Sequence, residues 1–376
     1  MLNSDDIKRF CRSIDIDLVG VTDAQPFSRW RRGMDLGIKN GWVRVPPSML
    51  PNDDDSMEAW ADPRHSLPSA RSIIVIGIRY LSPVPGVKGG EDGGGKVARE
   101  HWYDFYPYLD GKRDLLIEYL RGNGVVAIDV KLPVKAAAHR SGVGVYGKNT
   151  NIQNEDFGSW LLFRTVVTDL EISPDEESEP RCGACQRCLR LCPTKAIKEP
   201  YVLDSSRCLS TILSSPGPVP SEQREAVGMR ILGCDLCQEV CPRNESVPPL
   251  VGMEDRFVVG MGDDVDLRWV ANASSAELRG LLARSGNPSL DPDLLRRNAM
   301  IAMGNSGDIS FTETLERSLS DRQPLVRGHA AWALARLGSE DSIPILSAMV
   351  GTETDPQVRD EMEWALSRLM ENRTDV

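Results

Sequence analysis

The chain has 376 residues, a formal net charge of −11 and nine cysteines. Its length allows two or three domains with well-formed cores, and its acidic balance argues against indiscriminate binding to nucleic acid. The sequence contains no run close to the ~18 consecutive apolar residues of a membrane span, and its N-terminus lacks the basic and apolar segments of a secretion signal. We therefore expect a soluble, cytoplasmic protein that keeps its thiols reduced and has no membrane partner.

The first 175 residues are predicted to form a mixed α and β domain. Helical spacing of apolar residues and short runs of β-branched residues alternate along this part. The pattern predicts helices over 5–13 and 110–121, and strands over 17–21, 72–78 and 125–128. The strand over 72–78 is expected to be buried, because its apolar residues are uninterrupted.

A glycine-rich stretch at 142–149 matches the glycine pattern of dinucleotide-binding loops and nearly matches a phosphate-binding P-loop. A P-loop needs Ser or Thr where Asn149 stands. A dinucleotide site needs a strand before the glycines and a helix after them, whereas 134–140 reads as a helix and 151–157 as a loop. We interpret the stretch as a turn whose backbone closely approaches another group.

Eight of the nine cysteines lie within sixty residues. The run that begins at Cys182 is C-x2-C-x2-C-x3-C-P, the signature of a ferredoxin-type [4Fe–4S] cluster, and its fourth cysteine ligates the other cluster. A second run begins at Cys234 and lacks one cysteine, which Cys208 supplies. The spacing therefore predicts two complete sets, Cys182, Cys185, Cys188 and Cys241 for one cluster and Cys192, Cys208, Cys234 and Cys237 for the other.

Three other interpretations of the cysteines account for part of their pattern. Zinc sites also use C-x2-C pairs, but usually as two pairs without the third cysteine step. A disulfide framework is disfavoured in a long chain without a secretion signal. Clusters that only stabilise the fold stay an alternative to electron transfer. Cys11, in the first predicted helix, is interpreted as a small buried apolar side chain.

Residues 251–376 are predicted to be helical and repetitive. The segment 296–303 recurs at 327–334 and at 359–366, with Trp at the same offset in the last two. A period of 31 and then 32 residues indicates stacked helix pairs of the HEAT kind.

The charge is unevenly distributed between the cysteine region and the tail. Residues 181–243 carry nine Lys/Arg against six Asp/Glu, hence +3, whereas 291–376 carry nine against fifteen, hence −6. A polyanion would therefore be attracted to the cysteine region rather than to the tail.

These features together resemble the epoxyqueuosine reductase family, cobalamin-dependent iron–sulfur enzymes that complete queuosine in tRNA. The likeness is found at 62–75, 140–144, 147–149, 158–160, 199–201, 207–210, 233–238, 296–299 and 326–332. The cluster motifs alone are shared by many ferredoxins. Their combination with this N-terminal half and this tail is much more specific.

The resemblance implies an α+β protein in three parts: an N-terminal α/β cobalamin-binding and catalytic domain (1–175), a ferredoxin-like domain with two [4Fe–4S] clusters (176–250), and C-terminal α-helical HEAT-like repeats (251–376). It implies that the clusters pass single electrons to a cobalamin. The implied partners are a tRNA anticodon stem-loop and an external electron donor such as a flavodoxin or ferredoxin. We expect a monomer.

The resemblance also implies site residues. The family's cobalamin contacts carry over to Arg99 (one residue out of step with the family's arginine), Lys148, Asn149, Ser210 and Thr211. For tRNA, the arginines that match the family tail are Arg296, Arg297 and Arg327. The alternative for these arginines is an ion pair with acids between helices.

The family's catalytic aspartate, which donates a proton to the departing oxygen, corresponds to Asp129. Asp129 stands one residue nearer to Gly142 than in the family, and the stretch after it departs from the family pattern. Lys131, His139 and Tyr146 are therefore alternative donors, and a solvated strand end is the alternative interpretation of Asp129.

Two other functions stay open from the sequence. The first is a related cobalamin and [4Fe–4S] reductase that acts on a small molecule, which the altered region 129–146 would favour. The second is an electron-transfer or scaffold protein without a substrate of its own, whose partner docks on the helical repeats.

Overall fold

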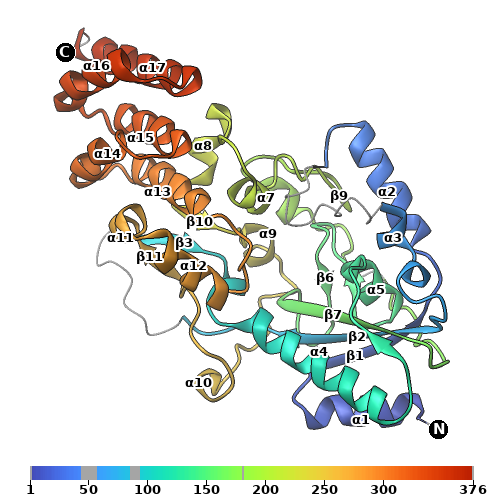
Figure 1. Ribbon diagram of the computed structural model, residues 1–376. Helices are drawn as coiled ribbons and strands as arrows, with labels where there is room; N and C mark the ends of the chain where they lie inside the picture. Colours follow the sequence, from blue (N-terminus) through green and yellow to red (C-terminus); the bar gives the residue numbers. More distant parts are fainter. Residues whose placement is uncertain (1, 44–56, 85–93, 180–181, 375–376) are drawn as a thin grey trace.

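The computed structural model describes residues 2–43, 57–84, 94–179 and 182–374. Figure 1 shows an elongated molecule with a mixed α and β part at the N-terminus and stacked helices at the C-terminus. The segment that carries the eight clustered cysteines lies between them. The order of α and β segments agrees with the predicted α+β class.

The N-terminal part is built on a four-stranded antiparallel sheet with strand order β1-β2-β7-β4. The strands are β1 (Leu18–Asp23), β2 (Ser72–Arg79), β7 (Leu161–Thr168) and β4 (Ala127–Ile128). Seven of the eight residues of β2 are buried, as the uninterrupted apolar run predicts. Successive side chains of β2 enter different cores, Ile74, Ile76 and Ile78 on one face and Ile73 and Val75 on the other. The sheet is therefore covered on both faces.

Helices from distant parts of the sequence cover these two faces. α1 (Ser4–Ser13) and α4 (Phe105–Gly122) contribute to the first core, and α5 (Val134–Arg140) contributes to the second. α1 begins with a capping box between Asn3 and Asp6 and buries residues at positions i and i+4. One of these is Cys11, which is 0% exposed. The interpretation of Cys11 as a buried apolar side chain is confirmed.

Five further elements complete this part: α2 (Ser28–Lys39), α3 (Met57–Ala61), β3 (Gly94–Val97), β5 (Val145–Tyr146) and β6 (Ile152–Gln153). β5 and β6 pair as a short hairpin. The prediction of a loop over 151–157 is therefore wrong at Ile152 and Gln153, because pairing with β5 overrides the polar composition. The glycine-rich stretch closes this hairpin as a tight turn, with the amide of Gly147 donating to the carbonyl of Asn151 at 2.8 Å.

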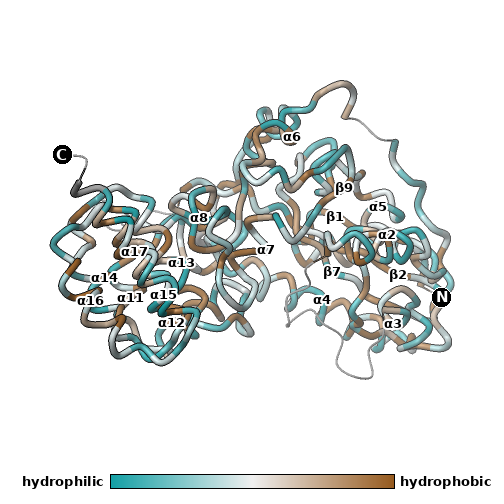
Figure 2. Tube along the Cα trace, turned by 90° about the horizontal axis from the view of Figure 1, so that it is seen from above, coloured by the Kyte–Doolittle hydropathy of each residue, from teal (hydrophilic) through white to brown (hydrophobic). Residues whose placement is uncertain are grey.

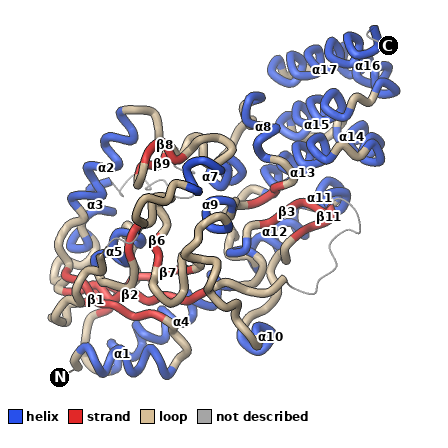
Figure 3. Tube along the Cα trace, turned by 180° about the vertical axis from the view of Figure 1, so that it is seen from behind, coloured by secondary structure: helices blue, strands red, loops and turns tan. Residues whose placement is uncertain are grey.

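The middle segment consists of short elements. They are α6 (Arg187–Leu191), β8 (Ile197–Glu199), β9 (Val202–Leu203), α7 (Leu209–Ser214), α8 (Ser221–Val227), β10 (Arg230–Leu232) and α9 (Leu236–Glu239). β10 joins a three-stranded sheet, β10-β3-β11, with β11 (Asp264–Asp266). This sheet takes one strand from each of the three predicted domains, and Figure 3 shows β3 and β11 between the N-terminal sheet and the stacked helices. The division into three domains stays a prediction, because the strands of this sheet join all three parts by hydrogen bonds.

The tail is a stack of helices. They are α10 (Met253–Arg256), α11 (Leu267–Asn272), α12 (Ser275–Arg284), α13 (Pro292–Ser306), α14 (Thr312–Ser318), α15 (Pro324–Leu337), α16 (Ile343–Thr352) and α17 (Pro356–Thr374). The three recurring segments fall in α13, α15 and α17, each of which begins with proline, the residue that suits a first helical turn. The predicted helical repeat is confirmed. Among the described segments, none of the helices has both the length and the apolar character that crossing a membrane requires.

Candidate functional site

The eight clustered cysteines lie as two groups of thiols in the middle segment. Electrostatic contacts in the first group join Cys188 with Cys241 and Cys182, and Cys241 with Cys182 and Cys185. Those in the second group join Cys208 with Cys192, Cys234 with Cys208, and Cys237 with Cys234 and Cys208. This grouping coincides with the two sets that the spacing predicts. Cys188 lies within α6 and Cys192 directly after it, so the end of this helix separates the two groups.

Backbone amides point at several of these sulfur atoms. The amides of Lys148 and Ala196 donate to the Sγ atoms of Cys182 and Cys192 at 3.4 and 3.3 Å. Cys208 is the residue before α7, and the amides of Ser210 and Thr211 in the first turn point at its sulfur. Free N–H groups at the start of a helix stabilise negative charge, so these positions suit a thiolate ligand.

The second group is the more deeply buried of the two. Burial raises the pKa of Cys234 to about 11 and the pKa of Cys237 further still, and neighbouring thiols add to the shift. Burial is also the first cause of the raised pKa of Cys208. Metal ions bind thiolates, so loading this site with metal would release protons. The bound metal would also offset the unfavourable burial of the charged sulfur atoms. Among the described residues, no three His, Cys, Asp or Glu side chains converge to hold a single metal ion.

The hairpin β5–β6 reaches from the N-terminal part into both cysteine groups. Asn151 Nδ2 and Gln153 Nε2 lie 3.8 and 3.5 Å from the Sγ atoms of Cys237 and Cys241. Sequence reasoning missed both amides. A signal was present: Asn151 and Gln153 are two residues apart, which places both amides on one side of an extended strand.

The side chains of Lys148 and Asn149, both predicted to contact cobalamin, bind the cysteine loops. Lys148 Nζ donates to the carbonyls of Gly183 and Cys185 at 2.6 and 3.0 Å. Asn149 is 4% exposed, and its Nδ2 donates to the carbonyl of Cys237 at 3.1 Å. The turn thus holds both groups of thiols against the N-terminal part.

Lys135, at the start of α5, is a second residue that sequence reasoning missed. Its Nζ donates to Asn151 Oδ1 at 2.8 Å, which links the ammonium through one amide to Cys237. The side chain is exposed to solvent, yet desolvation by the surrounding protein lowers its pKa against the attraction of Glu100, Cys237 and Cys208. Lys135 therefore lies beside the second group of thiols, to which Asn151 links it.

Arg99 lies beside the same group. Its guanidinium stacks on Trp102 at 4.1 Å and donates to the carbonyl of Ser82 at 2.5 Å. Its backbone amide donates to the buried carboxylate of Asp235, the residue after Cys234. Arg99 Nε is buried without a hydrogen-bond partner in the described part of the chain. A buried donor of this kind is available to a bound group.

Asp129 follows β4 and forms an ion pair with Arg113 on α4, with 2.8 Å between Oδ2 and Nη1. Its side chain is 47% exposed, and partial burial raises its pKa, which Arg113 opposes. Of the alternative donors, Tyr146 packs edge-on against His139 at 5.5 Å, and burial raises the pKa of Tyr146 to about 12. Lys131 is exposed.

Two protein families match parts of the chain. Residues 181–244 match the family described as a 4Fe-4S double cluster binding domain, and residues 279–367 match HEAT repeats. An epoxyqueuosine reductase from Lactococcus garvieae (strain Lg2) is 30% identical over 357 residues, which cover 89% of this chain and 95% of the relative. The chain belongs to the epoxyqueuosine reductase family. The resemblance found in the sequence is thereby confirmed.

Solved structures of this family share the whole fold. One is an epoxyqueuosine reductase with an epoxyqueuosine-modified stem loop of tRNA-Tyr, with a TM-score of 0.89 and 26% identity over 97% of this chain and 98% of that one. Another, from Bacillus subtilis, has a TM-score of 0.89 and 27% identity over the same shares. In that structure a catalytic loop that carries an aspartate is swung out of the active site.

Arg296 and Arg297 are buried, which contradicts their prediction as tRNA contacts, whereas Arg327 is paired but partly exposed. Arg297 is 1% exposed and donates to the carbonyls at the end of α7 and just after it, at residues 212, 213, 215 and 217. Arg296 is 7% exposed and pairs with Asp293. Arg327 forms a two-point ion pair with Glu353 at 2.6 and 2.7 Å. The buried guanidiniums of Arg296 and Arg297 cannot reach a phosphate. The role of Arg327 stays a prediction.

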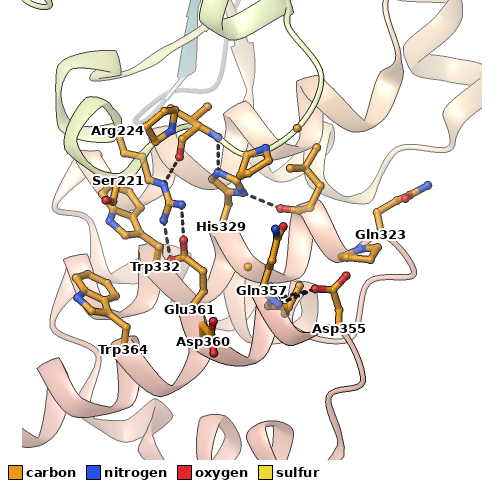
Figure 4. A pocket seen from close by; sticks show the side chains of 18 of the residues that line it. Ser221, Arg224, Gln323, His329, Trp332, Asp355, Gln357, Asp360, Glu361 and Trp364 are labelled. Carbon is orange, nitrogen blue, oxygen red and sulfur yellow. Dashed lines mark hydrogen bonds and ion pairs between the residues drawn. The ribbon is translucent and has the colours of Figure 1, made fainter.

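A cavity of about 830 Å³ lies where the loop 217–222 meets α15 and α17, away from the thiols (Figure 4). We call this contact between the loop 217–222 and the helices α15 and α17 the joint. Arg224 crosses the joint to form a two-point ion pair with Glu361. His329 Nδ1 donates to the carbonyl of Leu325 at 2.7 Å, and its Nε2 accepts from the amide of Val219 at 3.2 Å. The polar groups at the joint bind one another, so we assign the cavity a structural role.

Replacing Arg297 with Met should destabilise the protein without a specific effect on RNA. The change removes the hydrogen bonds of the guanidinium to four carbonyls, three of them buried, which costs roughly 3 kcal/mol. We expect a lower melting temperature and faster loss of cluster absorbance on heating. Arg322→Met, an exposed arginine in the same region, is the control. A stable Arg297→Met protein with weaker RNA binding and a smaller salt slope would restore the tRNA role.

His329 should make the joint sensitive to acid. Burial and then Arg224 lower its pKa from 6.5 to about 3, so the folded state keeps the imidazole neutral. Its stabilising contribution is complete above pH ~6.5 and falls by roughly 1 kcal/mol per pH unit below it. We expect His329→Gln to flatten the decline in unfolding free energy between pH 6.5 and 5. Parallel curves for the two proteins would refute this assignment.

Proposed function

We propose that this protein reduces epoxyqueuosine to queuosine in tRNA, using two [4Fe–4S] clusters and a cobalamin. The observation that carries this proposal is the match along 97% of the chain to the family structure with an epoxyqueuosine-modified stem loop. The overall change adds two electrons and two protons to the epoxide, whose oxygen leaves as water. The chain must therefore hold electron carriers, a proton donor and the substrate in one place.

The two groups of thiols fit two [4Fe–4S] clusters. Each group has four sulfur ligands, and amides of the hairpin and of the helix starts donate toward the sulfurs. We assign Cys182, Cys185, Cys188 and Cys241 to one cluster and Cys192, Cys208, Cys234 and Cys237 to the other. The amide donors stabilise the extra negative charge of a reduced cluster, which serves electron transfer as well as stability.

The residues beside the second group of thiols would hold a cobalamin. Arg99 offers a buried donor without a partner among the described residues, and the exposed ammonium of Lys135 borders the same thiols. Ser210 and Thr211 are in the first turn of α7, beside Cys208. Lys148 and Asn149 would contribute through the backbone of their turn, because their side chains bind the cysteine loops. When bound, a cobalamin supplies a strongly reducing metal centre for the epoxide.

We propose Asp129 as the proton donor to the departing oxygen. In the described conformation its carboxylate faces Arg113, so it acts after the segment that follows β4 has moved. The swung-out catalytic loop of the Bacillus subtilis relative supports such a movement in this family. The raised pKa of Asp129 favours the protonated form that a donor needs.

Asp129→Asn should lower turnover on the modified stem-loop about 100-fold or more, because an amide cannot replace an acid. The absorbance of the clusters and the corrin should stay unchanged. Asp114→Asn is a matched control, since Asp114 also pairs with Arg113 but at the outer side of α4. If Asp129→Asn keeps full activity, the same assay on Lys131→Gln, His139→Gln and Tyr146→Phe identifies the donor.

The function itself is tested with anaerobically reconstituted protein and hydroxocobalamin. We expect corrin absorbance to follow the protein through gel filtration, and mass spectrometry to show loss of one oxygen from an epoxyqueuosine-bearing anticodon stem-loop. The altered region 129–146 keeps one alternative open, a small-molecule electrophile as substrate. Corrin binding with turnover only on such an electrophile would support that alternative.

A further inference from the structure

One cluster ligand lies at the molecular surface. Cys185 is exposed, whereas the other seven clustered cysteines are partly buried. We call the set of thiols that contains Cys185 the outer group and the other set the inner group. An electron from outside would first meet the outer group.

The surface formed by the segment that follows Cys185 combines positive charge with one exposed apolar side chain. We call this surface the basic face, and define it as Arg187, Arg190, Leu191, Lys195 and Lys198, all of which are exposed. Leu191 is 55% exposed. A hollow of about 310 Å³ lies on this face, lined by Leu189, Arg190, Lys195, Ile197 and Lys198. Figure 2 shows α6, which carries part of the face, at an outer edge of the molecule.

The charge of the basic face differs from that of the chain. The protein carries −11 overall, and the basic face contains four cations. Arg187 is paired with Glu245 at 2.6 Å, and Glu199 follows Lys198 in the sequence. Arg190, Lys195 and Lys198 are the cations that surround the hollow. A positive patch on an acidic protein, next to a redox ligand, attracts a negatively charged partner to that place.

We propose that the basic face is the docking surface for a small acidic protein that carries one electron at a time, and that electrons enter through the cluster that Cys185 ligates. This inference rests on the proposed function. Each docking oxidises the carrier by one electron and reduces this protein by one, so two dockings supply the two electrons of the reaction. Such encounters use small interfaces with charges around an apolar centre.

The apolar residues favour a protein over RNA as the partner. Leu191 is exposed beside the cations, and Leu189 and Ile197 line the hollow. A phosphate backbone would use the cations alone, whereas a protein surface also buries apolar side chains.

The test follows reduction of the clusters by a reduced acidic flavodoxin in an anaerobic stopped-flow instrument. We expect the double variant Arg190→Glu, Lys198→Glu to lower the second-order rate at least ten-fold at low salt, and the difference to shrink at high salt. Arg317→Glu, Arg368→Glu is the matched control, since both arginines are exposed on the helical repeats. Leu191→Ser, which leaves the charge unchanged, should slow reduction at both salt concentrations.

A chemical reductant separates this inference from the proposed function. With dithionite, which needs no docking surface, the variants should reduce their clusters and turn over the modified stem-loop like the unmodified protein. Failure of every protein to turn over with dithionite would refute the proposed function. Equal flavodoxin rates in the double variant and the unmodified protein would overturn the docking surface. Loss of stem-loop affinity at unchanged flavodoxin rates would also overturn it, and would assign the basic face to RNA.

Discussion

Eight thiols held close together, partly out of water, are the constraint on which the middle of this molecule depends. A buried thiolate is unfavourable, and each neighbouring thiolate makes it more so, as the raised pKa values of Cys234 and Cys237 record. Helix starts at Cys208 and Cys234 and the amide-bearing hairpin β5–β6 supply donors for negative charge. Short helices and tight turns carry the thiols, apolar residues of α7 and β10 join the main core, and metal ligation would add to the folding energy.

The position of the inner thiols depends on the helical tail. α13 is buried over thirteen of its fifteen residues, because it lies between the tail and the cysteine segment. From α13, Arg297 binds carbonyls at the end of α7, and Asn298 binds the carbonyls of Leu213 and Ile231. α7 begins directly after Cys208 and β10 ends shortly before Cys234. The helical repeats thus hold α7 and β10 in place, and these two elements adjoin two ligands of the inner group, Cys208 and Cys234. This role explains why Arg297 is buried although its sequence resembles an RNA contact.

Much of the fold and part of the site could be predicted from local pattern. The buried strand β2, the first helix and the recurring helices follow from spacing that repeats every two or 3.6 residues. The cysteine sets follow from one short motif and the single cysteine that completes the second. Lys135 could not be assigned in this way, because its link to Cys237 runs through Asn151 to a cysteine about a hundred residues away. The spacing of Asn151 and Gln153 indicates a shared side of the strand but not that this side faces the cysteines. Arg297 was misjudged for the same reason, since its carbonyl partners are more than seventy residues upstream.

The amino-acid sequence by itself determined the family, the two sets of four thiols and the helical repeat, since each depends on residues at short and regular spacing. Only the tertiary structure decided which side chains face the thiols, which arginines donate hydrogen bonds to buried carbonyls, and which cluster ligand lies at the surface. These are properties of burial and of contacts between distant segments. Burial determines whether a charged group contacts water, a partner or a ligand, and the local spacing of residues does not specify this burial.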